Sequence, residues 1–375
     1  MPAPANRLDD LETPAAVVDV DRMANNLRLA SEYCAAHGLR WRPHAKTHKC
    51  RELGAAQVAA GAHGLTVATL REAEVMARVC NDLLLAYPPV GDARLSRLMD
   101  LPGHVRVTVA LDSAEALDPL SAAARAARRT VGVLVEVDVG MGRVGVGSPA
   151  AAVALARRAA NLDGVEFCGI AFYPGHLRGA AAEQDDAMTV LAAKVDEFVT
   201  ALRDAGLPPE VVSGGSTPTF WHSHLIPALT EVRPGTNIFN DRTTAEIGAC
   251  AWEECAYSVV ATVISTAVPG QAVVDAGAKA LAKEELRASG GGYGALLQRP
   301  EVTVKAVSEE HGILDLSRTD WRPSVGDRVR LVPNHVCVSV NLQDALYAVK
   351  GNEIVDRWPV AARGRERYDP SDVTR

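Results

Sequence analysis

Arg42-Pro-His-Ala-Lys-Thr-His-Lys49 closes the first strand that we expect, residues 39–44, and places Lys46 just beyond it. Within four residues of Lys46 lie four further basic side chains, Arg42, His44, His48 and Lys49. Nearby positive charge and burial both disfavour an ammonium ion and so lower a lysine pKa. A neutral amine is the form that attacks a carbonyl or holds an aldehyde cofactor. A basic surface turn has the same composition, so this interpretation depends on the rest of the chain.

Outward from this segment, short apolar strands alternate with Ala-, Leu- and Arg-rich helical stretches as far as residue 236. Eight strands are expected, at residues 39–44, 64–68, 82–87, 105–110, 132–138, 166–172, 210–213 and 230–233. Amphipathic helices are expected between them, for example at residues 70–80, 92–100, 113–127, 149–161 and 183–205. This alternation predicts a parallel sheet with helices outside it. Eight units in about 200 residues predict an α/β fold of the (β/α)8 TIM-barrel type rather than an open sheet.

Beyond residue 245 strands follow one another without long helices. We expect them at residues 256–266, 272–275, 301–307, 312–316, 327–333, 336–340 and 345–348. This pattern predicts a mostly antiparallel β-domain. The predicted domains are a barrel at residues 1–245 and a β-domain at residues 246–375. Residues 1–25 are placed in the barrel domain, and pairing of their strand with the β-domain is the alternative.

The composition excludes several classes of protein. The net charge of −7 argues against binding to nucleic acid or to a membrane surface. No apolar run is long enough to span a membrane, and the amino terminus lacks the apolar core of a signal peptide. The seven cysteines are scattered and odd in number, which argues against a disulfide framework and favours a reduced, cytoplasmic compartment.

Chemically useful residues follow five of the eight predicted barrel strands. They are Lys46, Arg143, the pair Tyr173 and His176, the turn Ser213-Gly-Gly-Ser-Thr217, and the turn Arg233-Pro-Gly-Thr236. Catalytic groups of such barrels lie at the carboxyl ends of the strands, and the loops after strands seven and eight frequently bind phosphate. Glycines let backbone N–H groups converge on an anion, and hydroxyls add donors. We therefore expect a phosphate site formed by Ser213, Gly214, Gly215, Ser216, Thr217, Gly235 and Thr236, although a plain turn has the same composition.

A lysine, a phosphate loop and a barrel together suggest a phosphorylated aldehyde cofactor held as a Schiff base, of which pyridoxal 5′-phosphate is the common example. Arg143 is then a cation facing an oxyanion, such as the cofactor phenolate, or else a surface residue capping a helix. A Schiff-base aldolase without a cofactor is the rival, and it would use the phosphate loops for its substrate.

His335 and Cys337 form a second motif, in the expected strand at residues 336–340. Residues i and i+2 of a strand point to the same face, so the two side chains could ligate one ion. Imidazole with thiolate favours Zn²⁺ over Mg²⁺ or Ca²⁺. Two protein ligands leave positions open for water or substrate. The alternative is a buried strand whose cysteine is a small hydrophobic residue.

Together these residues resemble the D-threonine aldolase / D-serine dehydratase family of fold-type III, alanine racemase-like pyridoxal-phosphate enzymes. The resemblance runs over nearly the whole chain. It rests on residues 11–14, 42–48, 66–73, 140–143, 213–218, 233–235, 275–277, 310–311 and 333–337. Alanine racemases are similar at the lysine and at the Gly-Met-Gly-Arg143 and Arg-Pro-Gly235 turns.

The resemblance implies that Lys46 is the Schiff-base lysine and that His335 and Cys337 hold the metal. It implies a lyase acting on β-hydroxy-D-amino acids, with Lys46, Tyr173 and His176 as catalytic residues and a homodimer as the assembly. A cysteine ligand with Zn²⁺ favours a dehydratase, which gives a 2-oxo acid and ammonia. An aspartate with Mn²⁺ would be typical of the aldolases, and Mn²⁺ or Mg²⁺ stays open here. Retro-aldol cleavage to glycine and an aldehyde is the alternative, and an amino-acid racemase is a lesser one. A pyridoxal-phosphate-binding regulatory protein would usually lack the β-domain and the metal pair.

Overall fold

The computed structural model describes residues 6–286 and 291–369, and the chain forms two compact units. One unit comprises Leu29–Gly235 and Ala361–Arg375, and the other comprises Met1–Arg28 and Thr236–Val360. The predicted domains met at residue 245, whereas the chain passes between the units within helix α1 (Val20–Ala36), after Gly235 and after Val360. None of the described helices is long and apolar enough to cross a membrane.

The first unit contains an eight-stranded parallel sheet, as predicted. Its strands are β2 (Arg40–Trp41), β3 (Leu65–Val67), β4 (Asp82–Leu85), β5 (Arg106–Leu111), β6 (Val131–Glu136), β7 (Val165–Ala171), β8 (Val211–Gly214) and β9 (Glu231–Val232). They pair in the order β2-β9-β8-β7-β6-β5-β4-β3. An isolated parallel bridge between His44 and Thr66 joins the segments of β2 and β3, the two ends of this order. The sheet is therefore TIM-like.

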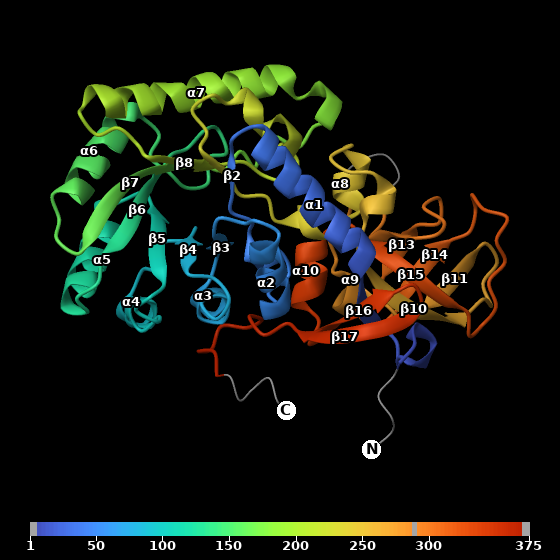
Figure 1. Ribbon diagram of the computed structural model, residues 1–375. Coiled ribbons are helices and arrows are strands. Elements are labelled where there is room, and N and C mark those ends of the chain that lie inside the picture. The colour runs from blue at the N-terminus through green and yellow to red at the C-terminus, as the bar shows by residue number, and fades with distance from the viewer. Residues whose placement is uncertain (1–5, 287–290, 370–375) are drawn as a thin grey trace. The chain divides into compact units, whose positions relative to one another are not determined.

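Helices follow the strands, and Figure 1 shows them around the outside of the sheet. They are α2 (Arg51–Ala59), α3 (Leu70–Met76), α4 (Asp92–Met99), α5 (Ala114–Ala126), α6 (Pro149–Ala160) and α7 (Asp185–Asp204). Local capping sets some of their starts. The Thr69 side chain accepts the backbone N–H of Glu72. The side chain of Ser148, which directly precedes Pro149, accepts the backbone N–H of Ala151. A side-chain acceptor at the cap and a proline in the first turn both favour a helix start.

Small and aliphatic side chains fill the inside of the sheet. Four consecutive strands, β4 to β7, contribute to one buried cluster, which consists of Leu84, Ala110, Leu134, Cys168 and Ala171. Because these strands are buried on both faces, their sequences are continuous apolar runs rather than alternating ones. The same property made them recognisable in the sequence.

The second unit is built on a mostly antiparallel nine-stranded sheet. Its strands are β1 (Ala15–Asp19), β10 (Tyr257–Ser265), β11 (Gln271–Val274), β12 (Gly294–Leu296), β13 (Val304–Val307), β14 (Gly312–Asp315), β15 (Arg328–Pro333), β16 (Ala345–Lys350) and β17 (Glu353–Pro359). The early strand β1 pairs antiparallel with β10 and parallel with β16, so it belongs to this sheet. Short helices α8 (Arg242–Glu246), α9 (Ala278–Leu281) and α10 (Val336–Asn341) connect the strands.

The strand predicted at residues 336–340 is wrong, because this segment is helix α10. Its Val-Cys-Val-Ser-Val sequence alternates as a strand does. The structure instead buries Val336, Ser339 and Val340, which have the i, i+3, i+4 spacing of a helix. The Asp241 carboxylate accepts the Val336 N–H at 3.1 Å and so caps the helix. Tertiary contacts therefore override the β preference of the valines.

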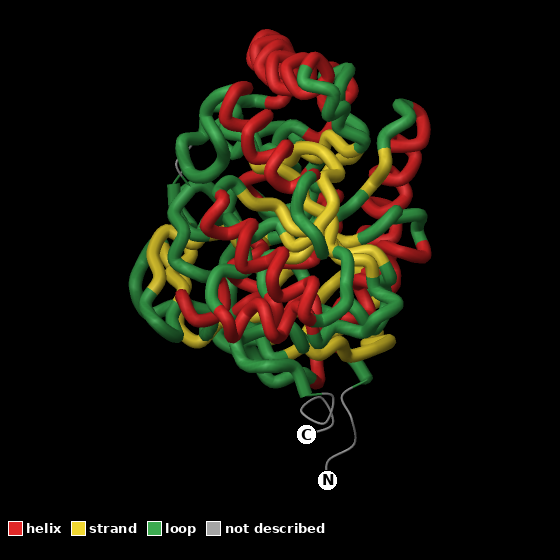
Figure 2. Tube along the Cα trace, turned by 90° about the vertical axis from the view of Figure 1, so that its left-hand side faces the viewer, coloured by secondary structure: helices red, strands yellow, loops and turns green. Residues whose placement is uncertain are grey.

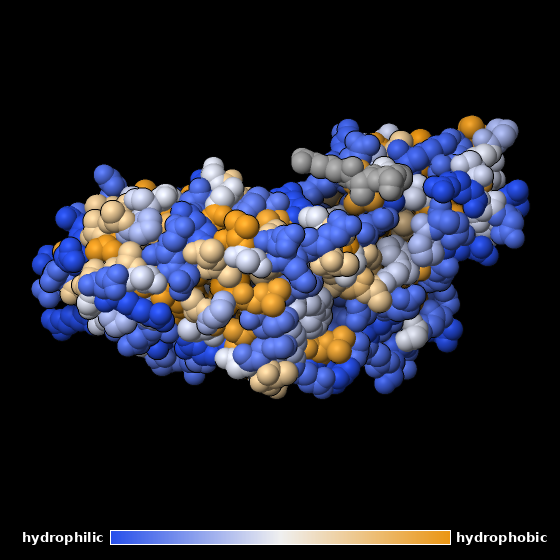
Figure 3. Space-filling view, turned by 90° about the horizontal axis from the view of Figure 1, so that it is seen from above, coloured by the Kyte–Doolittle hydropathy of each residue, from blue (hydrophilic) through white to orange (hydrophobic). Residues whose placement is uncertain are grey.

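Figure 2 shows the strands in yellow and the helices in red from a second direction. Polar side chains, in blue, cover much of the face drawn in Figure 3, with orange apolar patches between them. Among described residues the most exposed large apolar side chains are Val190, Val325 and Val90, and each comes from a different segment. Single exposed apolar residues are normal on a folded surface and do not by themselves indicate a binding site.

Candidate active site

Lys46 lies in a single 3-10 turn, Ala45–Thr47, which follows β2 after residues 42–44. The ring of His44 accepts the backbone N–H of Lys46 at 3.4 Å and caps this turn. His44 is also held by its bridge to Thr66. The lysine is therefore presented at the carboxyl end of the first barrel strand, where the sequence placed it.

The charges next to Lys46 in sequence have their own partners. Lys49 donates to the Glu72 carboxylate at 2.5 Å, and both side chains are buried. The guanidinium of Arg42 contacts the carboxylates of two residues, Asp82 and Glu231. Burial lowers the pKa of His48 to about 4 and that of His44 well below its usual range. The positive surroundings expected from the sequence are thus largely neutralised by ion pairs and by uncharged imidazoles.

Two cations lie over the ring of Tyr173. Lys46 Nζ is 5.8 Å from its centroid and the Arg143 guanidinium carbon is 5.0 Å from it. Tyr173 follows β7, Lys46 follows β2 and Arg143 follows β6. A cation within about 6 Å of an aromatic face is attracted to it. The structure therefore brings together three of the predicted residues from three separate strand ends.

A carboxylate holds the turn that carries Arg143. Asp138 Oδ1 accepts the backbone N–H groups of Gly140, Met141 and Gly142 at 3.0, 3.0 and 3.1 Å. These bonds, the Gly140 bond first, lower the pKa of the Asp138 carboxyl. A Cβ on Gly140 would lie 3.3 Å from Nε2 of His176, which places that histidine against the same turn.

The predicted phosphate turn begins in β8. Gly214 has no room for a side chain, because a Cβ would lie 2.2 Å from the Phe172 ring. Gly215 has a φ of +88°, a conformation that favours glycine. Thr217 Oγ1 accepts the Gly235 N–H at 3.2 Å, which ties the two predicted loops together. Thr236, predicted for the same site, begins the other unit, where its hydroxyl is 3.8 Å from Cys337 Sγ.

Arg233 is a member of this region that our site prediction left out. Its Nη2 donates to the carbonyl oxygens of Phe172 at 2.7 Å and Ser213 at 3.4 Å. Its Nε is buried and has no hydrogen-bond partner among the described residues. Burial, opposed by the charge of Glu136, lowers the pKa of its guanidinium. The Arg-Pro-Gly turn after the eighth strand was a usable signal for this residue.

A buried donor without a partner is the feature that a ligand would explain, because leaving such a group unpaired costs about 1–3 kcal/mol. At the same carboxyl ends of the barrel strands, the chain presents a lysine, a tyrosine with two cations over its ring and a glycine-rich turn. This set of amine, cations and hydroxyls fits a phosphorylated aldehyde such as pyridoxal phosphate.

The other unit contains the predicted metal pair. His335 is the N-cap residue of α10 and Cys337 lies in the first turn, so the helix start rather than a strand face sets their arrangement. Burial lowers the pKa of His335, but the thiol of Cys337 and the carboxylates of Asp241 and Glu284 raise it to about 10 overall. Its Nδ1 lies 2.5 Å from Glu284 Oε2.

Asp241 and Glu284 were not expected in this region. No group of three His, Cys, Asp or Glu side chains is arranged to hold an ion within residues 6–286 and 291–369. An imidazole and a thiol in contact are the donors that Zn²⁺ prefers. With only two such donors the pair fits an ion that keeps open positions, and it does not fit a closed structural site.

Two family models match this chain, one after the other along the sequence. The family model of the alanine racemase N-terminal domain matches residues 18–243, and that of a putative serine dehydratase domain matches residues 256–349. D-threonine aldolase of Arthrobacter sp is 33% identical, with 98% of this chain and 97% of that protein covered. D-threo-3-hydroxyaspartate dehydratase of Delftia sp. (strain HT23) is 35% identical, with 93% of this chain and 97% of that protein covered.

Solved structures give the same relationship. D-threonine aldolase from Filomicrobium marinum superposes with a TM-score of 0.89 at 33% identity, covering 97% of this chain and 99% of that one. A D-threo-3-hydroxyaspartate dehydratase structure, described as a cysteine-to-alanine mutant in the metal-free form, has a TM-score of 0.86 at 33% identity. It covers 97% of this chain and 100% of that one.

Proposed function

This chain belongs to the D-threonine aldolase / D-serine dehydratase family of alanine racemase-like lyases, and on that premise we propose that it is a dehydratase of β-hydroxy-D-amino acids that depends on pyridoxal phosphate and a divalent metal. The products would be a 2-oxo acid and ammonia. The observation that carries the proposal is the convergence of Lys46 and Arg143 on the ring of Tyr173 at the carboxyl ends of the barrel strands. A homodimer in the cytoplasm is proposed with it, and light scattering on the purified protein tests the dimer.

The barrel residues would hold the cofactor. Lys46 would bind its aldehyde, and Ser213, Gly214, Gly215, Ser216, Thr217 and Gly235 would surround its phosphate, with Thr236 next along the chain. Arg143 would face its phenolate, and Tyr173 would contact its ring. When bound, pyridoxal phosphate supplies an electron sink for the pair left at the substrate α-carbon. The unpartnered Nε of Arg233 supports an acceptor at this place.

The chain's own side chains would manage the proton and the leaving group. We propose the amine of Lys46 as the base that would remove the α-proton of the substrate. His335 and Cys337 would hold the divalent ion, which would supply a Lewis acid for the β-hydroxyl. The α-proton and the hydroxyl leave together as water, and hydrolysis of the product releases ammonia and the 2-oxo acid.

The second ligand favours elimination. Cys337 pairs with His335 where an aspartate would suit a harder ion such as Mn²⁺. Zn²⁺ is therefore the proposed ion, with Mn²⁺ and Mg²⁺ as alternatives. The dehydratase whose cysteine mutant was solved in a metal-free form supports a link between cysteine and metal in that relative.

A retro-aldol cleavage is the second candidate. The Arthrobacter relative, similar over 98% of this chain, is an aldolase. In that reaction His176 would remove the proton of the β-hydroxyl, and the Cα–Cβ bond would break to give glycine and an aldehyde. A racemase shares the fold alone, and it would exchange and invert the α-proton without either product.

The deciding experiment separates the products. Purified protein with pyridoxal phosphate and Zn²⁺ or Mn²⁺ is incubated with D-serine, D-threonine and D-threo-3-hydroxyaspartate. We expect keto acid and ammonia. Aldehyde with glycine would replace the dehydratase proposal by the aldolase, and exchange of the α-proton without either product would replace both by the racemase.

Two variants test the residue assignments. Lys46→Ala should abolish the absorbance band of the bound cofactor near the visible edge, whereas Lys194→Ala, at a partly exposed position of α7, should keep it. Cys337→Ala should keep that band and lose turnover, whereas Cys250→Ala should keep both. A band retained by Lys46→Ala, or full turnover by Cys337→Ala, would contradict the corresponding role.

A further inference from the structure

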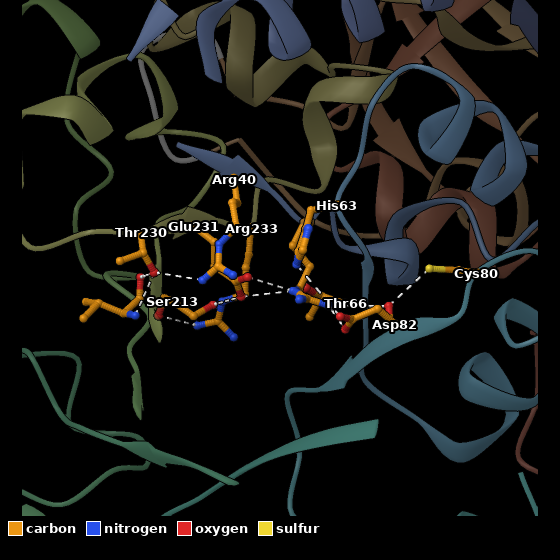
Figure 4. A network of polar contacts seen from close by, with 11 residues as sticks. Arg40, His63, Thr66, Cys80, Asp82, Ser213, Thr230, Glu231 and Arg233 are labelled. Carbon is orange, nitrogen blue, oxygen red and sulfur yellow. Dashed lines mark hydrogen bonds and ion pairs between the residues drawn. The ribbon is translucent and has the colours of Figure 1, made fainter. Parts of the chain in front are cut away.

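Figure 4 shows a network of buried polar contacts in the barrel that includes Glu231, Asp82 and Ser213. Arg42 Nε donates to both carboxylate oxygens of Glu231 at 3.1 and 2.9 Å, and its Nη1 donates to Asp82 Oδ1 at 2.5 Å. Ser213 Oγ donates to Glu231 Oε1 at 2.7 Å. The Glu231 carboxylate of β9 thus joins Ser213 of β8 to Arg42, which directly follows β2, and the Arg42 guanidinium extends the cluster to β4.

The cluster is enclosed and its geometry is constrained. The Glu231 side chain is 1% exposed and that of Arg42 is 7% exposed. Burial alone would lower the pKa of Arg42, but the charges of Glu231 and Asp82 raise it overall. A Cβ on Gly64 would collide with the guanidinium, so this glycine leaves the space that it occupies. Two buried charges of opposite sign compensate each other's lost hydration, so removing one partner leaves the other charge buried and uncompensated.

The cluster does not reach the cofactor side of the barrel directly. Arg42, Asp82 and Glu231 line a cavity of about 480 Å³, together with Arg40, His63 and Arg106. The cavity lies at the amino ends of the strands, because Arg40, Asp82, Arg106 and Glu231 are the first residues of β2, β4, β5 and β9. The proposed cofactor residues follow the carboxyl ends. Any effect of Glu231 on the cofactor therefore passes through other residues.

Two such routes exist. Ser213 starts the proposed phosphate turn, and its carbonyl oxygen accepts Nη2 of Arg233 at 3.4 Å. Arg42 precedes the Lys46 turn, its N–H donates to the Val232 carbonyl at 2.9 Å, and its carbonyl accepts the Thr66 hydroxyl at 2.9 Å. The lysine turn, the phosphate turn and Arg233 are thus all connected to the Glu231 carboxylate.

We propose that Glu231 is a positioning residue for cofactor binding, which it supports by fixing Ser213 and Arg42 rather than by touching the cofactor. The inference rests on the proposed function, since it takes pyridoxal phosphate as the ligand. It names a residue that neither the motifs nor the strand-end argument selected.

The test is a titration of the apoprotein with pyridoxal phosphate, in which the absorbance band of the bound cofactor reports equilibrium binding. Glu231→Gln should weaken binding about tenfold or more, the equivalent of one charge-assisted hydrogen bond. Asp82→Asn is the matched control, because it removes the other carboxylate on Arg42 without touching Ser213, and it should change affinity by less than about threefold. Thermal unfolding of each apoprotein is measured alongside.

The outcomes separate the explanations. Equal weakening by both variants with equal losses of apoprotein stability would reduce Glu231 to a general contributor to stability, and equal weakening without such losses would overturn the route through Ser213. Unchanged binding by Glu231→Gln would overturn the proposal. Because the Ser213 hydroxyl donates to Glu231 Oε1, Ser213 would meet the phosphate through its backbone. In the Ser213→Ala/Glu231→Gln double variant, binding should therefore be no weaker than in Glu231→Gln alone, and additive losses would overturn the route through Ser213. If Glu231→Gln does not fold, Glu231→Asp takes its place with the same expectation. If the wild-type protein bound no pyridoxal phosphate, the proposed function itself would be refuted. The wild-type titration gives this result before any variant is measured.

Discussion

Replacing Glu72 by glutamine tests how the Lys46 turn is held. Lys49, three residues after Lys46, has a φ of +55° and pairs its ammonium with Glu72 Oε1 at 2.5 Å. The Lys49 and Glu72 side chains are 9% and 1% exposed. The other oxygen of Glu72 accepts the Ala68 N–H at 2.6 Å. A glutamine has one oxygen for two donors and carries no charge, so Glu72→Gln leaves a buried ammonium uncompensated.

Breaking a buried ion pair by removing one partner costs about 3–5 kcal/mol. For a unit of this size each kcal/mol lowers the melting temperature by about 2–4 °C, so a loss on the order of 10 °C is expected. Urea unfolding followed by circular dichroism measures the free energy. Glu197→Gln is the control, because Glu197 pairs with Lys194 at 2.8 Å on the surface, where such pairs contribute about 0–1 kcal/mol.

A double variant sharpens the test. Lys49→Met combined with Glu72→Gln removes the uncompensated charge, so it should recover about half or more of the lost free energy. A Glu72→Gln cost below about 1 kcal/mol, no larger than that of the control, would refute the claim that this pair is buried and coupled.

Three further predictions concern the fold and the site. Gly214→Ala should cost about 1–3 kcal/mol in urea unfolding, because its Cβ would lie 2.2 Å from Phe172, whereas Gly179→Ala meets nothing within 4 Å and should be nearly neutral. Burial lowers the pKa of His48 to about 4, so its contribution to stability is complete above about pH 6.5 and is lost as the pH falls towards 4. His48→Asn should therefore reduce the slope of unfolding free energy against pH between 5 and 6 by about 1 kcal/mol per unit, and an unchanged slope would contradict the burial argument. EDTA should abolish turnover but keep the cofactor absorbance band, and full activity after dialysis against EDTA would remove the metal from the mechanism.

The barrel could be predicted from the sequence because its strands are buried on both faces. Runs such as Val131–Glu136 contrast sharply with the amphipathic helices beside them, so strand positions follow from composition alone. Strand β17 was missed for the converse reason. Four of the seven residues of Glu353–Pro359 are exposed and three of these four are charged, and only the pairing with β16 makes the segment a strand.

The candidate site was predictable where residues act from strand ends and not where they act through distant partners. Lys46, Arg143 and Tyr173 stand out because unusual residues follow successive apolar strands. The pairing of Arg42 with Glu231 joins residues 189 positions apart, and no local pattern announces it. For His335 and Cys337 the expected proximity was found for a different reason, since a helix cap rather than a strand face brings them together.

This difference changes the electrostatic argument for Lys46. The sequence suggested that Arg42 and Lys49 surround it with positive charge, but each of these cations has a carboxylate within 2.9 Å that cancels most of its field. The cation that shares an aromatic ring with Lys46 is Arg143, which is distant in sequence and held by the Asp138 turn. The positive charge next to the proposed catalytic amine therefore comes from Arg143 on another strand end. The basic neighbours of Lys46 in the motif instead anchor the turn through their ion pairs.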